Sequence, residues 1–168
     1  MRQIVSHYKK SRIAPGLNHL TAPVLALRMR TIVLDTNVFV SALLSQRGTA
    51  YRLLMLLDKG VFQLSLSVPL VVEYEDAAKR ILHQTRLTDE DLDTILDYVC
   101  RVSDKQKIYY LWRPFLRDPH DDMVLELAVA AECDAIITFN RKDFGGVEAF
   151  GLQVLTPVDF LRQIGQLP

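Results

Sequence analysis

The sequence has few of the features that mark secreted, membrane-spanning or disulfide-linked proteins. Only two cysteines, Cys100 and Cys133, occur in 168 residues. No apolar run approaches the roughly 18 to 20 residues needed to cross a bilayer. The first residues also contain no apolar stretch long enough for the core of a signal peptide. We therefore expect one cytoplasmic domain with reduced cysteines and no membrane partner.

The chain also lacks net charge, but its charges are unevenly distributed. Residues 1–30 carry six Lys or Arg and no acid, whereas residues 31–168 carry 14 Lys or Arg against 20 acids, a net of −6. We predict that residues 1–29 form an N-terminal extension, interrupted by Pro15-Gly16 and Pro23, and that residues 30–168 form the domain. Three interpretations of the extension stay open: a basic arm that attracts RNA, a loosely attached tail, or sequence upstream of a true start at Met29.

An acidic domain does not resemble a protein that wraps duplex nucleic acid, because phosphate binding usually leaves a basic surface. It can still act on a polyanion if bound cations neutralise several of its carboxylates.

Short apolar, β-branched segments alternate with segments of helical periodicity. Strands are expected at residues 31–34, 62–66, 107–111, 135–138 and 154–155. Helices are expected at residues 39–44, 50–57, 67 onward, 88–102, 123–132 and 157–164. Because strands alternate with helices, the pattern predicts a parallel α/β sheet.

Four acidic positions stand out by their place in this pattern. Asp35 ends the first strand, Asp121 and its neighbour Asp122 follow the third, and Asp143 follows the fourth. Glu73 interrupts an otherwise apolar helical run. In an open α/β sheet, ligands bind beyond the carboxyl ends of the strands, so we expect these acids to line a site there.

Carboxylates crowded together raise one another's pKa and repel, and a divalent cation between them removes the repulsion. Ligation by oxygen alone favours Mg²⁺ or Mn²⁺ over zinc, and no Cys/His cluster has the spacing of a zinc site. The chemistry that such a site favours is metal-assisted attack of water on a phosphodiester.

Each acid also has an ordinary structural explanation. Asp35 is well placed to cap the next helix, Glu73 to face solvent, and Asp143 to cap a short helix. Asp118-Pro119 is a common turn sequence, and Asp121 and Asp122 would complement a helix dipole. Two other functions stay open: a phosphatase like the haloacid dehalogenases, with Asp35 as nucleophile, and a non-catalytic interaction module that holds a structural ion.

Four ordered motifs resemble those of the PIN-domain family over about residues 31–160. They are Leu-Asp-Thr-Asn-Val at 34–38, Val-Val-Glu-Tyr-Glu at 71–75, Asp-Pro-His-Asp-Asp-Met-Val-Leu-Glu-Leu-Ala at 118–128, and Ile-Ile-Thr-Phe-Asn-Arg-Lys-Asp-Phe at 136–144. The group that the motifs resemble most is the toxins of toxin–antitoxin systems, relatives of VapC.

This resemblance implies a three-layer α/β/α, flavodoxin-like sandwich around a mostly parallel sheet of four or five strands. It implies a Mg²⁺- or Mn²⁺-dependent endoribonuclease acting on single-stranded RNA, a cognate antitoxin and a homodimer. The catalytic and metal-binding acids would be Asp35, Glu73, Asp121 and Asp143, with Asp118 or Asp122 as a further or alternative ligand. Supporting residues would be Thr36, Asn37, Thr138 and Asn140. RNA contacts are expected from Arg47, Arg113, Arg117, Arg141 and Lys142, with Tyr110 or Trp112 as stacking surfaces.

Overall fold

The computed structural model describes residues 29–109, 111 and 113–168. Our interpretations of residues 1–28, and of stacking by Tyr110 and Trp112, therefore lie outside the described residues. The described chain contains a five-stranded sheet in the order β3-β2-β1-β4-β5, and every neighbouring pair is parallel. Its strands are β1 (Arg30–Leu34), β2 (Phe62–Leu66), β3 (Asp104–Lys105), β4 (Ala135–Ile137) and β5 (Gln153–Leu155).

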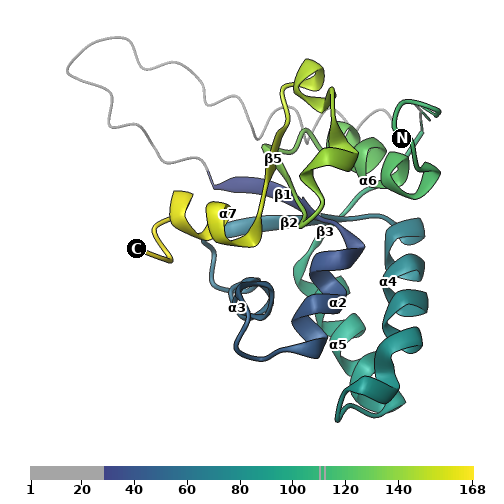
Figure 1. Ribbon diagram of the computed structural model, residues 1–168, viewed down its shortest axis with the longest axis vertical. Coiled ribbons are helices and arrows are strands. Elements are labelled where there is room, and N and C mark those ends of the chain that lie inside the picture. Colours follow the sequence, from purple (N-terminus) through teal and green to yellow (C-terminus); the bar gives the residue numbers. More distant parts are fainter. Residues whose placement is uncertain (1–28, 110, 112) are drawn as a thin grey trace, which may run out of the picture.

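Helices cover both faces of the sheet, which confirms the expected α/β/α layers. In the view of Figure 1, α2, α3, α4 and α5 lie below the sheet and α6 lies above it. The α-helices are α2 (Thr36–Leu44), α3 (Thr49–Met55), α4 (Val68–Ile81), α5 (Asp89–Val102), α6 (Pro119–Ala130) and α7 (Pro157–Gln163). Short 3₁₀ helices are η1 (Leu82–Gln84), η2 (Arg141–Phe144) and η3 (Val147–Phe150). None of the described helices is both long enough and apolar enough to cross a membrane.

The strand order reverses at β1. The chain moves outward from β1 to β2 and β3, then returns past β1 to β4. Because right-handed crossovers in opposite directions place their helices on opposite faces, a crevice opens between the carboxyl ends of β1 and β4. Leu34 is paired with Ile137 in this register, so Asp35 and Thr138, the next residues, lie side by side.

The core explains the continuous apolar runs of the sequence. Ile32, Val33 and Leu34 of β1 are fully buried, as expected for a central parallel strand covered on both faces. Phe39 of α2 stacks on Tyr74 of α4 with ring centroids 4.5 Å apart, so these two helices pack tightly beneath β1. No disulfide joins Cys100 and Cys133.

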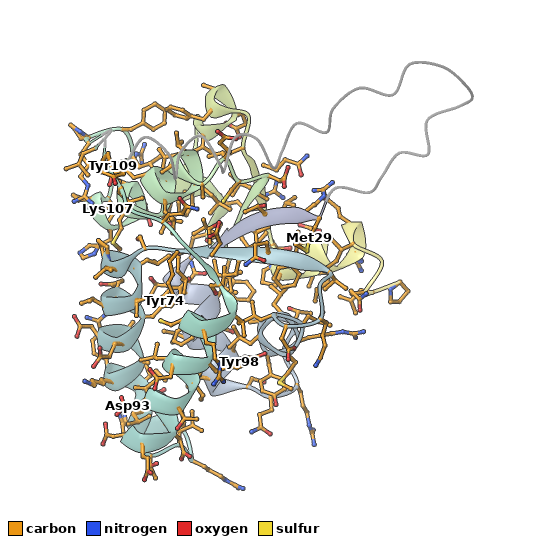
Figure 2. The ribbon with its side chains drawn as sticks, turned by 180° about the vertical axis from the view of Figure 1, so that it is seen from behind. Met29, Tyr74, Asp93, Tyr98, Lys107 and Tyr109 are labelled. Carbon is orange, nitrogen blue, oxygen red and sulfur yellow. The ribbon has the colours of Figure 1, made fainter. Side chains whose placement is uncertain are left out.

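The third strand was predicted wrongly at residues 107–111. Its two residues, Asp104 and Lys105, pair with the last two residues of β2, and the next amide, of Gln106, donates to Leu66 O at 2.7 Å. β2 then ends and α4 begins, so a longer third strand would have no partner. Figure 2 shows Lys107 and Tyr109 at the outer surface, and Tyr109 is 73% exposed.

The helix predicted at residues 123–132 begins earlier, at Pro119. Asp118 is its N-cap residue and accepts a hydrogen bond from the His120 amide at 2.9 Å, while Pro119 occupies the first turn. Proline suits this position because its missing N–H would have no partner there in any case. Asp121 and Asp122 therefore lie in the first helical turn and not in a preceding loop.

Candidate active site

A hydrogen-bonded network holds Asp35 at the crevice between β1 and β4. Asp35 is 7% exposed, and its Oδ2 accepts bonds from Asn37 Nδ2 and Thr138 Oγ1, both at 2.6 Å. Asp35 occupies the N-cap position of α2, but its side chain makes no capping hydrogen bond. The carboxylate is thus directed by two side chains, one from each side of the crevice.

The same network joins the ends of the two strands. Thr138 Oγ1 also accepts from Asn37 Nδ2 at 3.1 Å and from the Asn140 amide at 2.9 Å. Asn37 Oδ1 accepts from the Phe139 amide at 3.2 Å. Asn37 and Thr138, two of the predicted supporting residues, therefore contact Asp35 directly, and Asn140 contributes through its backbone. We call this set, Asp35, Asn37 and Thr138, the β1–β4 clamp.

Burial raises the pKa of Asp35 above its usual value, and the charge of Asp143 raises it further. The hydroxyl of Thr138 and the nearby amides of Asn37 and Thr36 act in the opposite direction, because they favour the charged form. Thr36, the fourth predicted supporting residue, therefore contributes its backbone to the site.

Asp121 brings a second carboxylate to the cluster. Desolvation raises the pKa of Asp121 to about 6, with further contributions from the charges of Asp35, Asp118 and Asp143, while His120 lowers it. Three acids from separate segments, the end of β1, the first turn of α6 and η2, thus influence one another. The structure brings together Asp35, Asp121 and Asp143, with Asp118 close by.

Glu73 lies at the margin of this cluster. It faces the start of α6 from α4, with Oε2 at 3.7 Å from His120 Nδ1 and Oε1 at 3.5 Å from Arg80 Nη2. Its side chain is 21% exposed, so it is not a fully solvated helix residue. The contacts of Glu73 connect it to the residue that precedes Asp121.

Asp122 has a different environment from Asp121. It is 1% exposed, and its Oδ1 accepts from the amides of Leu116 at 2.8 Å and Phe115 at 3.3 Å. Its other oxygen, Oδ2, has no hydrogen-bond partner among the described residues. Asp122 therefore fastens the loop before α6 to the helix, a structural role that the sequence analysis missed.

The residues predicted to contact RNA differ in whether their charged groups are already paired with an acid. The guanidinium of Arg113 donates to both carboxylate oxygens of the buried Glu126, with Nε–Oε1 and Nη2–Oε2 distances of 3.1 Å. Arg141 Nη1 lies 3.9 Å from Asp159 Oδ2. Arg47, Arg117 and Lys142 are exposed.

Tyr74 is a further residue that the sequence analysis did not assign to the site. It is fully buried beneath the sheet (Figure 2), and its hydroxyl donates to the carbonyl of Leu34, the residue before Asp35. Burial, with the charge of Asp35, raises the pKa of Tyr74 well above its usual value, so the hydroxyl stays a neutral donor. The sequence holds no local signal for this hydrogen bond, because its two residues are 40 positions apart.

The donor chemistry of the cluster fits a hard divalent cation. Within the described ranges, no three His, Cys, Asp or Glu side chains converge into a ready-made metal cage. Mg²⁺ does not require one, because it usually keeps several waters and binds through one or two carboxylates. Asp35, Asp121 and Asp143 carry carboxylate oxygens, the type of donor that such an ion prefers.

Comparison with known proteins bears on the family and the fold of the chain. The PIN-domain family model matches residues 31–142, a span that includes Asp35, Glu73 and Asp121 and stops one residue before Asp143. The fold is similar to that in the crystal structure of VapBC2 from Rickettsia felis bound to a DNA fragment from their promoter, with a TM-score of 0.50, 15% identity, and coverage of 74% of this chain and 98% of that one. No curated protein matches. Because the family model spans well over half of its length, the chain belongs to the PIN-domain family, whose members are generally nucleases that use divalent metal ions.

Proposed function

We propose that the protein is a divalent-metal-dependent endoribonuclease that hydrolyses RNA phosphodiester bonds. One observation carries the proposal: the β1–β4 clamp holds Asp35 at the crevice where Asp121 and Asp143 share its electrostatic environment. Such crowding costs free energy unless a cation neutralises it, and a cation-filled acidic crevice attracts the phosphates of RNA.

In this proposal Asp35, Asp121 and Asp143 hold Mg²⁺ or Mn²⁺, and Glu73 and Asp118 act at the margin. The bound cation would stabilise charge on the phosphoryl oxygens and make water a stronger nucleophile. Asn37 and Thr138 orient the carboxylate of Asp35, and Asp122 keeps the loop before α6 in place.

We further propose that the protein is the toxin of a toxin–antitoxin pair, inhibited by a cognate antitoxin, and that it forms a homodimer. The support is the likeness of its fold to VapBC2, together with the family assignment. An acidic crevice also suits a basic antitoxin side chain. Substitution of the acids should then weaken antitoxin binding as well as cleavage, and unchanged antitoxin affinity would contradict this mode of inhibition.

The decisive experiment compares the purified protein with Asp35→Asn on labelled single-stranded RNA in Mg²⁺ or Mn²⁺. The parent should cut the RNA, and the variant should be slower by roughly 10²-fold or more, the scale of removing one group that stabilises transition-state charge. Asp76→Asn, on the exposed face of α4, is the matched control and should cut normally.

Folding of Asp35→Asn is checked by urea denaturation, so that unfolding is not mistaken for loss of the site. A folded variant that cuts as well as the parent would contradict the site. A parent that binds Mn²⁺ but cuts no RNA would favour the non-catalytic interaction module. Trapping of a phosphoaspartate at Asp35 would favour the phosphatase alternative.

A further inference from the structure

A groove of about 460 Å³ runs along the edge of the sheet formed by β5. Arg141, Lys142 and Glu148 supply charged side chains to its lining, and Gln153, Val154 and Gln163 supply polar and apolar surface. The groove is separate from the carboxylate cluster, but η2 contributes to both.

The 3₁₀ helix η2 contributes residues both to the groove and to the carboxylate cluster. This single turn of 3₁₀ helix carries Arg141 and Lys142, which line the groove, and Asp143, whose charge acts on Asp35 and Asp121. A molecule bound by Arg141 and Lys142 would therefore contact the same turn that carries Asp143.

The charge of the groove is opposite to that of the domain. Residues 31–168 carry a net charge of −6, whereas the lining has two cations against one acid, Glu148. Arg141 has only a loose, exposed ion pair with Asp159 at 3.9 Å, and such pairs contribute little stability. Arg141 can therefore exchange its ion pair with Asp159 for one with a phosphate at a small cost in free energy.

The floor of the groove offers hydrogen-bonding groups. The Gln153 amide donates to Asp134 O, and Leu155 O accepts from the Thr138 amide, so both residues bond toward β4. Alternation along a parallel strand then turns the backbone groups of Val154, which lies between them, toward the groove. Arg30 Nη1 donates to Oε1 of Gln153 at 3.2 Å and of Gln163 at 2.7 Å, which fixes both carboxamides.

We propose that this groove holds the single-stranded RNA segment that flanks the scissile phosphate, with Arg141 and Lys142 bound to its phosphates. The inference rests on the proposed action on RNA and adds the path of the substrate. Two neighbouring cations, neutral carboxamides and backbone groups at the edge of the sheet match a phosphate backbone with its sugars and bases. A peptide strand added to β5 would use the backbone groups, but its own backbone would bring no anion to the two cations.

The test measures binding of a labelled single-stranded RNA oligonucleotide to the full chain without divalent ions, over a range of salt concentrations. Arg141→Gln/Lys142→Gln should weaken binding by more than about tenfold near 0.1 M salt. It should also reduce the slope of log K against log[salt] by about 1.4, or about 0.7 for each lost phosphate contact. Arg86→Gln/Arg101→Gln removes two exposed charges that do not line the groove, one before α5 and one near its end, and should leave the slope unchanged.

A second variant tests the same groove in the opposite direction. Glu148→Gln removes the acid of the lining and should tighten RNA binding severalfold. The inference is overturned if the Arg141/Lys142 variant binds RNA like the control, or if it instead loses a co-purifying protein, which would indicate strand addition at β5.

Because cleavage plays no part in this assay, the two proposals fail separately. A parent that cuts no RNA in any divalent metal overturns the proposed function. If Arg141→Gln/Lys142→Gln binds RNA as tightly as the parent, only the proposed path of RNA through the groove is overturned. Both substituted residues are exposed, so urea midpoints equal to the parent's are expected and serve as the folding check.

Discussion

Glu73 and Tyr74 are neighbours in the sequence, yet they face different environments. Glu73 reaches the start of α6 at the margin of the cluster, while Tyr74 points inward and bonds to the carbonyl before Asp35. Through these two neighbouring residues, α4 contacts both the margin of the carboxylate cluster and the end of β1, which precedes Asp35.

Tyr74→Phe should test this internal link. The ring keeps its stack on Phe39, but the hydroxyl donor is lost, so the free energy of unfolding should fall by about 0.5–1.5 kcal/mol. RNA cleavage should slow through kcat, while RNA affinity without metal stays unchanged, because only the Leu34–Asp35 backbone is released. Tyr109→Phe, at an exposed tyrosine, is the control. A cleavage rate equal to the parent's would show that Tyr74 has no positioning role.

Asp121 should give the metal-free protein a recognisable pH dependence. Its folded pKa is about 6, against 3.8 for the ordinary value, so between these values the folded state binds more protons than the unfolded state. Stability therefore falls as the pH rises through this window. In EDTA, Asp121→Asn should be more stable than the parent by about 1 kcal/mol near pH 7, a figure reduced for partial exposure.

That advantage should shrink as the pH is lowered through about 6 and disappear well below 3.8, where the parent's carboxyl is protonated in both the folded and the unfolded state. Urea denaturation at a series of pH values measures it. A constant difference across the series would mean that the substitution acts through packing and not through charge.

Among the secondary-structure elements, those with local signals could be predicted from the sequence. Thr88-Asp-Glu-Asp predicted the start of α5, and the structure has the full capping box: Thr88 Oγ1 accepts from the Asp91 amide, and Asp91 Oδ2 accepts from the Thr88 amide. The prediction of a strand at residues 107–111 was wrong because the position and length of β3 depend on where its partner β2 ends. That partner lies in a distant segment of the sequence.

The same distinction holds for the site. Acids that follow strands, such as Asp35 and Asp143, are visible in the sequence because strand ends share one edge of the sheet. Asp121 was preferred to Asp122 only through the resemblance to the family, because adjacent positions on a helix point about 100° apart and the tertiary structure decides which one faces the cluster. The Tyr74 hydroxyl bonds to a carbonyl 40 positions away, and no local pattern predicts that contact.

The α5 cap provides a prediction that separates stability from activity. Thr88→Ala should lower the free energy of unfolding by about 1 kcal/mol, because one helix N–H loses its acceptor. Cleavage of RNA by the folded protein should not change, since Figure 1 shows the start of α5 at the opposite end of the molecule from α6.

Thr94→Ala in the same helix is the control for this prediction. It should leave stability unchanged or raise it, because alanine has the higher helix propensity. A loss of cleavage in folded Thr88→Ala would contradict the assignment of the site to the edge near α6.

At the scale of the whole molecule, a cation that binds only the folded state must stabilise the entire domain. At a concentration 100 times its Kd, Mg²⁺ or Mn²⁺ should add about 2.7 kcal/mol to the free energy of unfolding. EDTA should remove this gain, and Asp35→Asn should not show it. Thermal denaturation with Na⁺ at equal ionic strength separates specific binding from general screening of the net charge of −6 on residues 31–168. Equal stabilisation by Na⁺ would contradict a specific site.

The β1–β4 clamp has a consequence for the order of events during synthesis. Asn37 and Thr138 are 101 positions apart, so the ribosome must add at least that many residues after Asn37 before the clamp can orient Asp35. A nascent chain that has emerged only through β3 has its first acid but neither Thr138 nor Asp143. The proposed nuclease site would therefore be incomplete, and unable to cleave RNA beside the ribosome, until the residues through Asp143 have emerged.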